Sequence, residues 1–250
     1  MTGPRRGYVL IHGAHHDSRI WARVIPLLDL PALSVDLPGR SDPSHLHGLT
    51  VEDCAEEVLS QIRAAAFEQA IVVGHSLGGT VAYSLAAHAP ERVIALVGVA
   101  AVFPPPGQSA LSMWPPGFRW LPRMLLSLRP GGVSAPITMG ARQAIRRLAN
   151  DLDEDDTRWL LNLLGPETSG LTASPVASAE LDPATLRRYV LCRQDTALKP
   201  SRQRRQAQMI GAEIIEIDTG HDPMISSPTT LAKVLTSTCR QDKLGGAGRE

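Results

Sequence analysis

Short, continuous apolar runs recur in the first part of the chain and alternate with segments whose apolar residues have helical spacing. Continuous apolar runs lie at residues 8–11, 71–73 and 93–99, and a further short strand is expected at residues 33–36, where Leu33 and Val35 are apolar. The segments with helical spacing lie at residues 20–28, 51–62 and 81–88. Continuous apolar runs are typical of strands that are buried on both faces of a sheet. Their alternation with helices predicts a parallel sheet with helices on both faces.

The pattern changes in residues 103–185, where no strand-like run occurs and prolines are frequent. Helices are expected there near residues 141–149 and 155–164. We interpret this segment as a mostly helical insertion that folds over the carboxyl edge of the sheet. Two further strands are expected, at residues 189–192 and 213–217.

The sequence therefore predicts an α/β fold with a mostly parallel sheet of about six strands and a helical cap insertion. We assign residues 1–102 and 186–240 to the core and residues 103–185 to the cap. The last helix is expected to end near residue 238, and the tail 241–250, rich in glycine, is expected to be disordered. A length of 250 residues fits a single domain of this kind.

Composition argues against several classes of partner. The 25 basic and 25 acidic residues cancel, so neither nucleic acid nor an anionic membrane is expected as a partner. Cys54, Cys192 and Cys239 are far apart and suggest neither a disulfide framework nor a metal site. No apolar run is long enough to span a membrane, and the start does not resemble a signal peptide, so we expect a cytoplasmic protein.

Gly74, Ser76 and Gly78 form a G-x-S-x-G pattern between an apolar run and a helical segment. This is the nucleophile-elbow pattern, in which a serine sits on a tight turn from strand to helix. The flanking glycines are needed because a Cβ atom would collide with the neighbouring strand and helix. The N-terminus of the helix behind the serine favours negative charge. We therefore predict that Ser76 is a nucleophile.

A serine hydroxyl needs a base within hydrogen-bond reach, and the base needs an acid that orients it. In this architecture the acid and then the histidine follow the serine along the chain. Asp195 and His221 each lie just beyond a predicted strand, so we expect them at the same sheet edge as Ser76. We predict His221 as general base and Asp195 as its acid. Asp182 and Asp218 compete for the acid, as does Asp222, whose side chain is expected to point away from the His221 ring.

Acyl transfer also needs N–H donors for the developing oxyanion. We predict the backbone N–H groups of Leu77 and Ala14, because the neighbouring Gly13 lets its loop approach the elbow. The expected pocket residues are His15, His75, Trp114, Trp120 and Trp159. Surface positions for the His15–His16 pair and core positions for the tryptophans are the alternatives. No metal site is expected, because no nearby Cys or Glu completes a ligand set with His12, His15 and His16.

Together these residues resemble the α/β-hydrolase superfamily over residues 8–101 and 189–238. The segment His12-Gly13-Ala14 with Trp21, the elbow and the turns at Asp195 and His221 are similar to the branch of small methylesterases and hydroxynitrile lyases. The resemblance implies a catalytic triad of Ser76, Asp195 and His221, an oxyanion hole at Ala14 and Leu77, and no cofactor.

Two departures bear on the branch. The hydroxynitrile lyases carry Thr in place of Gly13 and Lys in place of Asp222. A positive charge at the position of Asp222 helps to stabilise cyanide, whereas the negative charge of a carboxylate would destabilise it. The sequence therefore argues against lyase chemistry of that kind.

We expect a serine hydrolase that cleaves a carboxylic ester, thioester or lactone of a small to medium apolar substrate through an acyl-enzyme. One alternative on the same fold is a C–C bond hydrolase, a lyase, or a cyclase that rearranges lactones in a biosynthetic pathway. A second is a ligand-binding protein without catalysis. The expected partner is a small-molecule substrate, and the protein is expected to act alone or as a homodimer.

Overall fold

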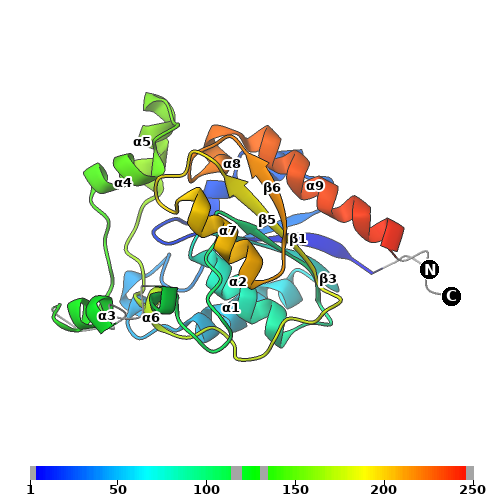
Figure 1. Cartoon of the computed structure of the whole chain (residues 1–250), viewed down its shortest axis with the longest axis horizontal. Helices are drawn as coiled ribbons and strands as arrows, with labels where there is room; N and C mark the ends of the chain where they lie inside the picture. The colour runs from blue at the N-terminus through cyan, green and yellow to red at the C-terminus, as the bar shows by residue number, and fades with distance from the viewer. Residues whose placement is uncertain (1–3, 114–119, 130–134, 246–250) are drawn as a thin grey trace.

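Six parallel strands form one sheet in the computed structural model of the protein, which describes residues 4–113, 120–129 and 135–245 (Figure 1). The strands are β1 (Arg6–Ile11), β2 (Ala32–Val35), β3 (Gln69–His75), β4 (Val93–Val99), β5 (Leu186–Cys192) and β6 (Glu213–Ile217). Their order across the sheet is β2-β1-β3-β4-β5-β6, and every neighbouring pair is parallel. The predicted fold class is confirmed.

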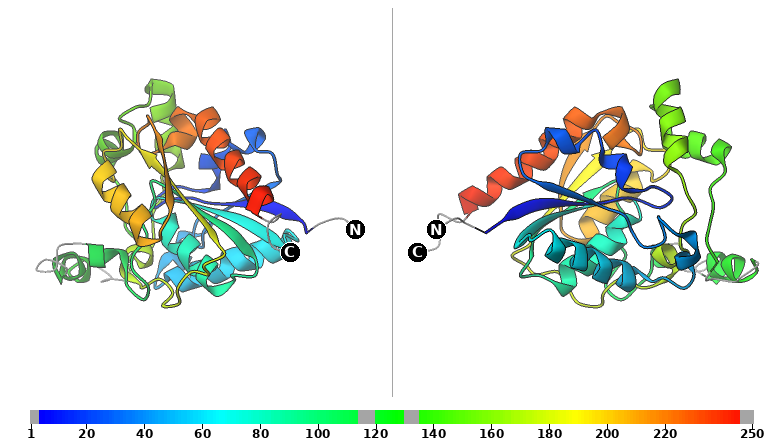
Figure 2. Two further views of the ribbon diagram at one scale, coloured as in Figure 1. Left: turned by 45° about the vertical axis from the view of Figure 1, so that its right-hand side comes forward. Right: turned by 180° about the vertical axis from the view of Figure 1, so that it is seen from behind.

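Side chains that alternate along each strand fill two separate cores, one on each face of the sheet. In β1, Val9 packs into the first core and Leu10 into the second, and in β3 Val72 and Val73 do the same. The helices α1 (Val51–Ala64), α2 (Gly78–His88) and α7 (Pro200–Met209) contribute to the first core, whereas α8 (Pro223–Ser226) and α9 (Pro228–Gly245) contribute to the second (Figure 2). Burial on both faces explains why the strands are continuous apolar runs.

Local signals in the sequence account for some helix boundaries and not for others. Helix α1 begins at the predicted capping box, in which the side chains of Thr50 and Asp53 each bond the backbone N–H of the other. The helix expected at residues 20–28 is wrong. Two short 3-10 helices, η1 (Ser18–Trp21) and η2 (Ile25–Leu27), replace it, because Pro26 has no N–H to continue a helical ladder.

The insertion is helical, as expected, but it is not one separate cap. Its described helices are η4 (Ala110–Met113), α3 (Trp120–Ser127), α4 (Ala141–Leu148), α5 (Glu154–Leu163) and α6 (Gly170–Ala173). Helices α4 and α5 pack into the second core, whereas α3 lies apart from them (Figures 1 and 2). The end of the insertion returns to α2, where the N–H of Ala177 donates to Ser84 Oγ at 2.9 Å and the Tyr83 hydroxyl to the carbonyl of Ala179 at 3.1 Å.

The C-terminal helix is longer than expected. Helix α9 continues to Gly245 and so includes residues 241–245 of the expected tail 241–250. The residues that extend it, Gln241, Lys243 and Leu244 among them, are strong helix formers. Residues 246–250 lie outside the described part of the chain. No helix in the described ranges is both long and apolar enough to cross a bilayer.

Candidate active site

Ser76 occupies the tight turn between β3 and α2. Its backbone φ of 49° lies in the left-handed region, which is costly for a residue with a side chain. The surrounding backbone holds this conformation, because the N–H of Ser76 donates to the carbonyl of Val99 at 3.1 Å and the N–H of Val102 donates to the carbonyl of Ser76 at 2.9 Å. The strained turn predicted from the sequence is therefore present.

Two glycines allow other segments to pass close to this turn. A Cβ atom on Gly78 would overlap the carbonyl oxygen of His12, so glycine lets the start of α2 pack against the end of β1. A Cβ atom on Gly13 would lie 2.8 Å from both His75 Nδ1 and Ser76 Cβ. Contacts this short do not occur between real side chains, so the loop after β1 approaches the elbow only because Gly13 has none.

The structure brings Ser76, His221 and Asp195 together from three different strand ends. The Nε2 atom of His221 lies 3.0 Å from Ser76 Oγ, and its Nδ1 atom lies 2.7 Å from Asp195 Oδ2. Ser76 follows β3, Asp195 follows β5 and His221 follows β6. The shared carboxyl edge of parallel strands thus explains how residues far apart in the sequence meet.

Asp195 is held by hydrogen bonds that its oxygens accept. The backbone N–H groups of Ala197 and Leu198 donate to Oδ1 at 2.7 and 2.8 Å, and Gln203 Nε2 donates to Oδ2 at 2.9 Å. An ionised carboxylate only accepts hydrogen bonds, so these contacts fit the charged form. Gln203 comes from α7 and was not predicted from the sequence.

Nearby carboxylates stabilise the protonated form of His221. Burial lowers the pKa of its imidazole, but the charge and hydrogen bond of Asp195 outweigh burial and raise the pKa above its usual value. Asp222 and Asp151 raise the pKa further. A base placed in this way holds a proton well in the charged intermediate of a reaction.

The direction of the Ala14 N–H group, in the loop after β1, follows from the hydrogen bonds of its neighbour Gly13. The carbonyl of Gly13 accepts hydrogen bonds from His12 Nδ1 at 2.8 Å and from the N–H of His16 at 3.3 Å. Because the peptide bond is trans, the N–H of Ala14 points the opposite way. Within the described ranges, neither this N–H nor that of Leu77 donates to another protein group.

A cavity of about 300 Å³ opens over Ser76. Its lining includes Ser76 and His221, the predicted oxyanion residues Ala14 and Leu77, and His15. Apolar side chains supply much of the remaining wall, and α4 of the insertion adds two polar ones. The further lining residues are His16, Val102, Met139, Gln143, Arg147, Leu148, Ala197 and Leu198.

His15 is fixed by the insertion. Its backbone φ is 68°, its N–H donates to Glu167 Oε2 at 3.0 Å, and its Nδ1 atom lies 3.1 Å from the carbonyl of Gly165. A carbonyl only accepts, so Nδ1 carries the proton and Nε2 keeps its lone pair. Burial lowers the pKa of His15, which favours this neutral ring. The buried guanidinium of Arg40 pairs with the same Glu167 carboxylate.

Of the other predicted pocket residues, His75 and Trp159 are described and do not line the cavity. His75 is fully buried beneath the elbow, and its Nε2 atom donates to the carbonyl of His221 at 3.1 Å. The ring of Trp159 packs against the second core, with the Arg23 guanidinium 4.7 Å from its centroid. Trp120 opens α3, but its side chain lies outside the described part of the chain, and so does all of Trp114.

The insertion forms hydrogen bonds with the loops that carry Asp195 and His221. These contacts were not predicted from the sequence. The hydroxyl of Thr196 donates to the carbonyl of Arg147 at 3.1 Å, and Asn150 Nδ2 donates to the carbonyl of Gln194 at 2.9 Å. The N–H of Gly220 donates to Asp151 Oδ2 at 2.5 Å. Most of these partners are backbone atoms of distant segments, which leave no sequence pattern.

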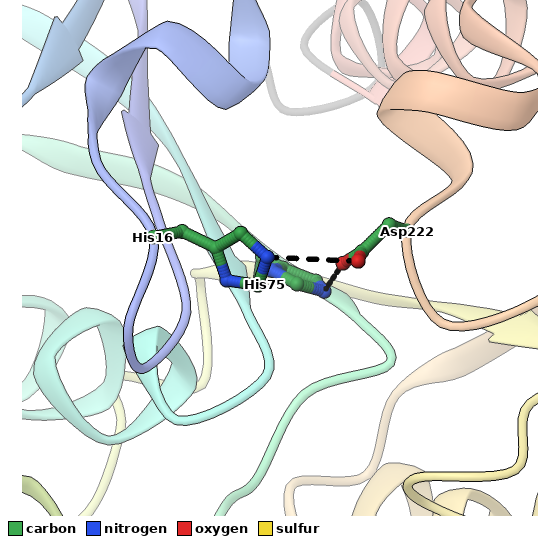
Figure 3. Close-up of side chains that lie close together, drawn as sticks. All are labelled: His16, His75 and Asp222. Carbon is green, nitrogen blue, oxygen red and sulfur yellow. Dashed lines mark ion pairs between the residues drawn. The ribbon is translucent and has the colours of Figure 1, made fainter. Parts of the chain in front are cut away.

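A second group of titratable side chains, drawn in Figure 3, is linked to the first by the hydrogen bond from His75 to the carbonyl of His221. His16, His75 and Asp222 are buried, and one possible ligand atom from each lies within 4.8 Å of the others, so the group could hold a metal ion. Asp222 faces the two histidines at 3.5 and 3.3 Å rather than Nδ1 of His221. His12, by contrast, faces the backbone, since its Nε2 accepts from the N–H of Leu37 at 3.2 Å.

Comparison with known proteins gives matches along nearly the whole chain. A family model described as "Alpha/beta hydrolase family" matches residues 8–234. The chain is 31% identical over 196 residues to the pimeloyl-[acyl-carrier protein] methyl ester esterase of Sodalis glossinidius, a match that covers 78% of this chain and 63% of that one. A Vibrio vulnificus esterase of the same name is matched over only 35% of its length. The carbendazim hydrolyzing esterase of Nocardioides sp. is 27% identical over 243 residues, covering 92% and 98% of the two chains.

Solved structures share the fold at lower sequence identity. A pyrethroid hydrolase from Sphingobium faniae superposes with a TM-score of 0.74 at 24% identity over 93% of this chain and 96% of that one. An extracellular alpha/beta-hydrolase from a Paenibacillus species gives a TM-score of 0.76 at 20% identity over 92% and 98%. A methylesterase from Arabidopsis gives 0.73 at 18% identity over 94% and 98%. These likenesses establish the fold.

Proposed function

Since the chain belongs to the α/β-hydrolase family, we propose that it hydrolyses carboxylic esters through an acyl-enzyme formed on Ser76. One observation carries the proposal, namely the continuous hydrogen-bonded chain from Ser76 through His221 to Asp195 at the floor of the cavity. The names of similar proteins, which include two kinds of esterase, support the same reaction class.

In the first half of the reaction, Ser76 Oγ attacks the ester carbonyl while His221 Nε2 takes its proton. The charge on the carbonyl oxygen is stabilised by the N–H groups of Ala14 and Leu77, which have no other protein acceptor in the described ranges. Asp195 stabilises the His221 imidazolium. As the tetrahedral intermediate collapses, His221 returns the proton to the leaving alkoxide, which departs as the alcohol.

In the second half, water takes the place of the alcohol. His221 removes a proton from the water as its oxygen attacks the acyl carbon, and the same N–H groups hold the second oxyanion. Collapse breaks the bond to Ser76 Oγ, which recovers the proton from His221. The carboxylic acid leaves and the starting enzyme is restored, so the cycle needs no cofactor.

The size of the cavity fits an ester with a small to medium acyl or alcohol group. At about 300 Å³ it lies at the lower end of the range for small-molecule sites. Its wall is largely apolar, from residues such as Val102, Met139 and Leu198. This size favours short esters over the large substrate that a tailoring cyclase would need to enclose.

Turnover of p-nitrophenyl acetate and of short methyl esters tests the proposal. Ser76→Ala should lower kcat by a factor on the order of 10⁴ or more, because no other group forms the acyl-enzyme. Ser60→Ala, which changes an exposed serine of α1, is the matched control and should keep full activity. Ester turnover that is equal in Ser76→Ala and in the unmodified protein would refute the proposal.

A homodimer and a cytoplasmic location are further proposals about the protein. Light scattering on the purified chain tests the first, because a dimer has twice the mass of the 26.9 kDa monomer. Cell fractionation with an antibody tests the second. A single monomeric species, or recovery of the protein outside the cytoplasm, would contradict the respective proposal.

A further inference from the structure

The ring of His15 borders the cavity, and no step of the proposed ester hydrolysis uses it. His15 directly follows Ala14, whose N–H group is proposed to bind the carbonyl oxygen of the ester. Both residues line the cavity together with Ser76. A substrate group that contacts His15 therefore lies close to the reacting carbonyl.

The hydrogen bond to Gly165 determines which nitrogen of the His15 ring is free. The Nδ1 atom lies 3.1 Å from the carbonyl of Gly165, which can only accept, so Nδ1 carries the proton and Nε2 keeps a lone pair. Burial lowers the pKa of the ring, in agreement with this neutral form. The two nitrogens are separated by a ring carbon, so Nε2 faces away from the Gly165 carbonyl.

The Nε2 atom of His15 has no protein partner and is accessible. No group in the described ranges forms a hydrogen bond with it. The Nε2 atom of His16 also lacks a partner, but that atom is completely buried. His15 Nε2 is not among the completely buried atoms without a partner, so it reaches the surface of the protein. Because His15 lines the cavity, this lone pair is available to a molecule that binds there.

The insertion holds His15 in a conformation that is costly by itself. Its φ of 68° lies in the left-handed region, which a residue with a side chain rarely adopts. The N–H of His15 donates to Glu167 Oε2 at 3.0 Å, and its carbonyl accepts the N–H of Gly165 at 2.8 Å. Together with the bond from Nδ1, these contacts fix both the backbone and the ring. Strained residues that their surroundings hold in place are concentrated at ligand sites.

The other polar side chains of the cavity wall do not duplicate this acceptor. Arg147 has only donors, and Gln143, also from α4, can both donate and accept. His16 directs its Nδ1 to the carbonyl of Ala14 at 3.0 Å. Outside the triad, His15 is thus the lining residue that offers a fixed lone pair beside the loop of Ala14.

We propose that His15 is a specificity-determining residue, whose Nε2 atom accepts a hydrogen bond from a hydroxyl or N–H group near the ester carbonyl of the substrate. This inference rests on the proposed function of Ser76. The substrate class is then an ester with a donor on the carbon next to the carbonyl, such as a 2-hydroxy ester. An ester without a donor would displace water from Nε2 and leave the lone pair unpaired, which costs binding.

Two esters of nearly equal size test the inference, methyl 2-hydroxypropanoate and methyl 2-fluoropropanoate, each as single enantiomers. Both carry an electronegative atom next to the carbonyl, but only the hydroxyl can donate. His15→Gly removes the ring, and glycine adopts a φ of 68° without strain, so both backbone bonds can remain. The ratio of kcat/KM for the hydroxy ester to that for the fluoro ester should fall by roughly three- to tenfold, the range for one neutral hydrogen bond. The change should appear mainly as a higher KM for the hydroxy ester.

His45→Gly is the matched control, because His45 is exposed and does not line the cavity, so the ratio should stay the same. An unchanged ratio in His15→Gly, with Ser76 still essential for turnover, would overturn the role of His15 and leave the proposed function intact. Failure of the unmodified protein to hydrolyse any ester would refute the proposed function.

A binding measurement tests His15 independently of turnover and of the folding of His15→Gly. Nitrogen NMR of the Ser76→Ala protein should show His15 as a neutral ring with its proton on Nδ1. Saturating methyl 2-hydroxypropanoate should shift the Nε2 resonance of His15, whereas methyl 2-fluoropropanoate should not. A proton on Nε2, or equal shifts with both esters, would overturn the inference.

Discussion

The carboxylate of Glu167 accepts a hydrogen bond from the backbone N–H of His15 at 3.0 Å. Glu167 belongs to the insertion, and His15 directly follows Ala14, the proposed oxyanion residue. The same carboxylate pairs with the buried guanidinium of Arg40 and accepts the N–H of Thr168 at 2.8 Å. The insertion therefore holds the loop of the proposed oxyanion residue Ala14, in addition to forming one wall of the cavity.

Glu167→Ala should destabilise the fold and lower activity together. It leaves the Arg40 charge buried without its partner, which typically costs about 3–5 kcal/mol, and it frees the His15 N–H. Urea denaturation measures the first effect and kcat for a short ester the second. Asp155→Ala removes an exposed ion pair with Arg158 and should leave both values unchanged. A Glu167→Ala protein as stable and active as the unmodified one would show that the support is dispensable.

Gly13→Ala should disturb the elbow directly. The added Cβ would lie 2.8 Å from both His75 Nδ1 and Ser76 Cβ, so backbone or side chains must move, at a typical cost of about 1–3 kcal/mol. We expect a lower melting temperature and a lower kcat. Gly140→Ala is the control, since a Cβ there meets no atom within 4 Å. Equal effects of the two substitutions would contradict the close approach of Gly13.

The pH dependence of kcat/KM should report His221. The ring must be neutral to take the proton of Ser76, and Asp195 outweighs burial to raise its pKa above 6.5. A raised pKa means that the proton is retained to higher pH, so activity should rise through an apparent pKa above 6.5. Asp195→Asn should shift that limb to lower pH and reduce kcat by a factor on the order of 10⁴. An acidic limb that lies below the ordinary histidine value in the unmodified protein would contradict this assignment.

Arg147 should influence which esters are accepted. It is an exposed residue of α4 that lines the cavity, and it has no acidic partner within the described ranges. A methyl ester with a free carboxylate at its far end should therefore show a higher kcat/KM than the uncharged ester of equal length. Arg147→Gln should remove the difference, whereas Arg142→Gln, on the same helix but outside the cavity lining, should keep it. If Arg147→Gln keeps the preference for the ester with a free carboxylate, another group is responsible for that preference.

The parallel sheet was predictable because most of its strands are buried on both faces. The apolar runs around Val72 and around Val97 therefore contain no polar residue that would hide the strand pattern. The structure also brings Ser76, Asp195 and His221 together, as their positions after parallel strands suggested. Residues far apart in the sequence can meet here, because the carboxyl ends of all parallel strands lie at the same edge of the sheet.

The remaining parts of the site depend on tertiary contacts that leave no local pattern. Asp222 could be recognised as a carboxylate beside the base, but its direction is set by His16 and His75 from two other loops. Trp159 was expected in the pocket, but the position of α5 turns it toward Arg23. The support of His15 by Glu167 joins residues 152 positions apart, and no spacing rule connects them.

Covalent labelling of the unmodified protein with a fluorophosphonate is the most direct test of the account. The reagent reacts with an activated serine, so mass spectrometry should find one label per chain, on the peptide that contains Ser76, with matching loss of ester turnover. Ser76→Ala should take up no label, and His221→Ala should react far more slowly. A label on another residue, or a protein that stays unlabelled while it hydrolyses esters, would contradict the assignment of Ser76 as the nucleophile.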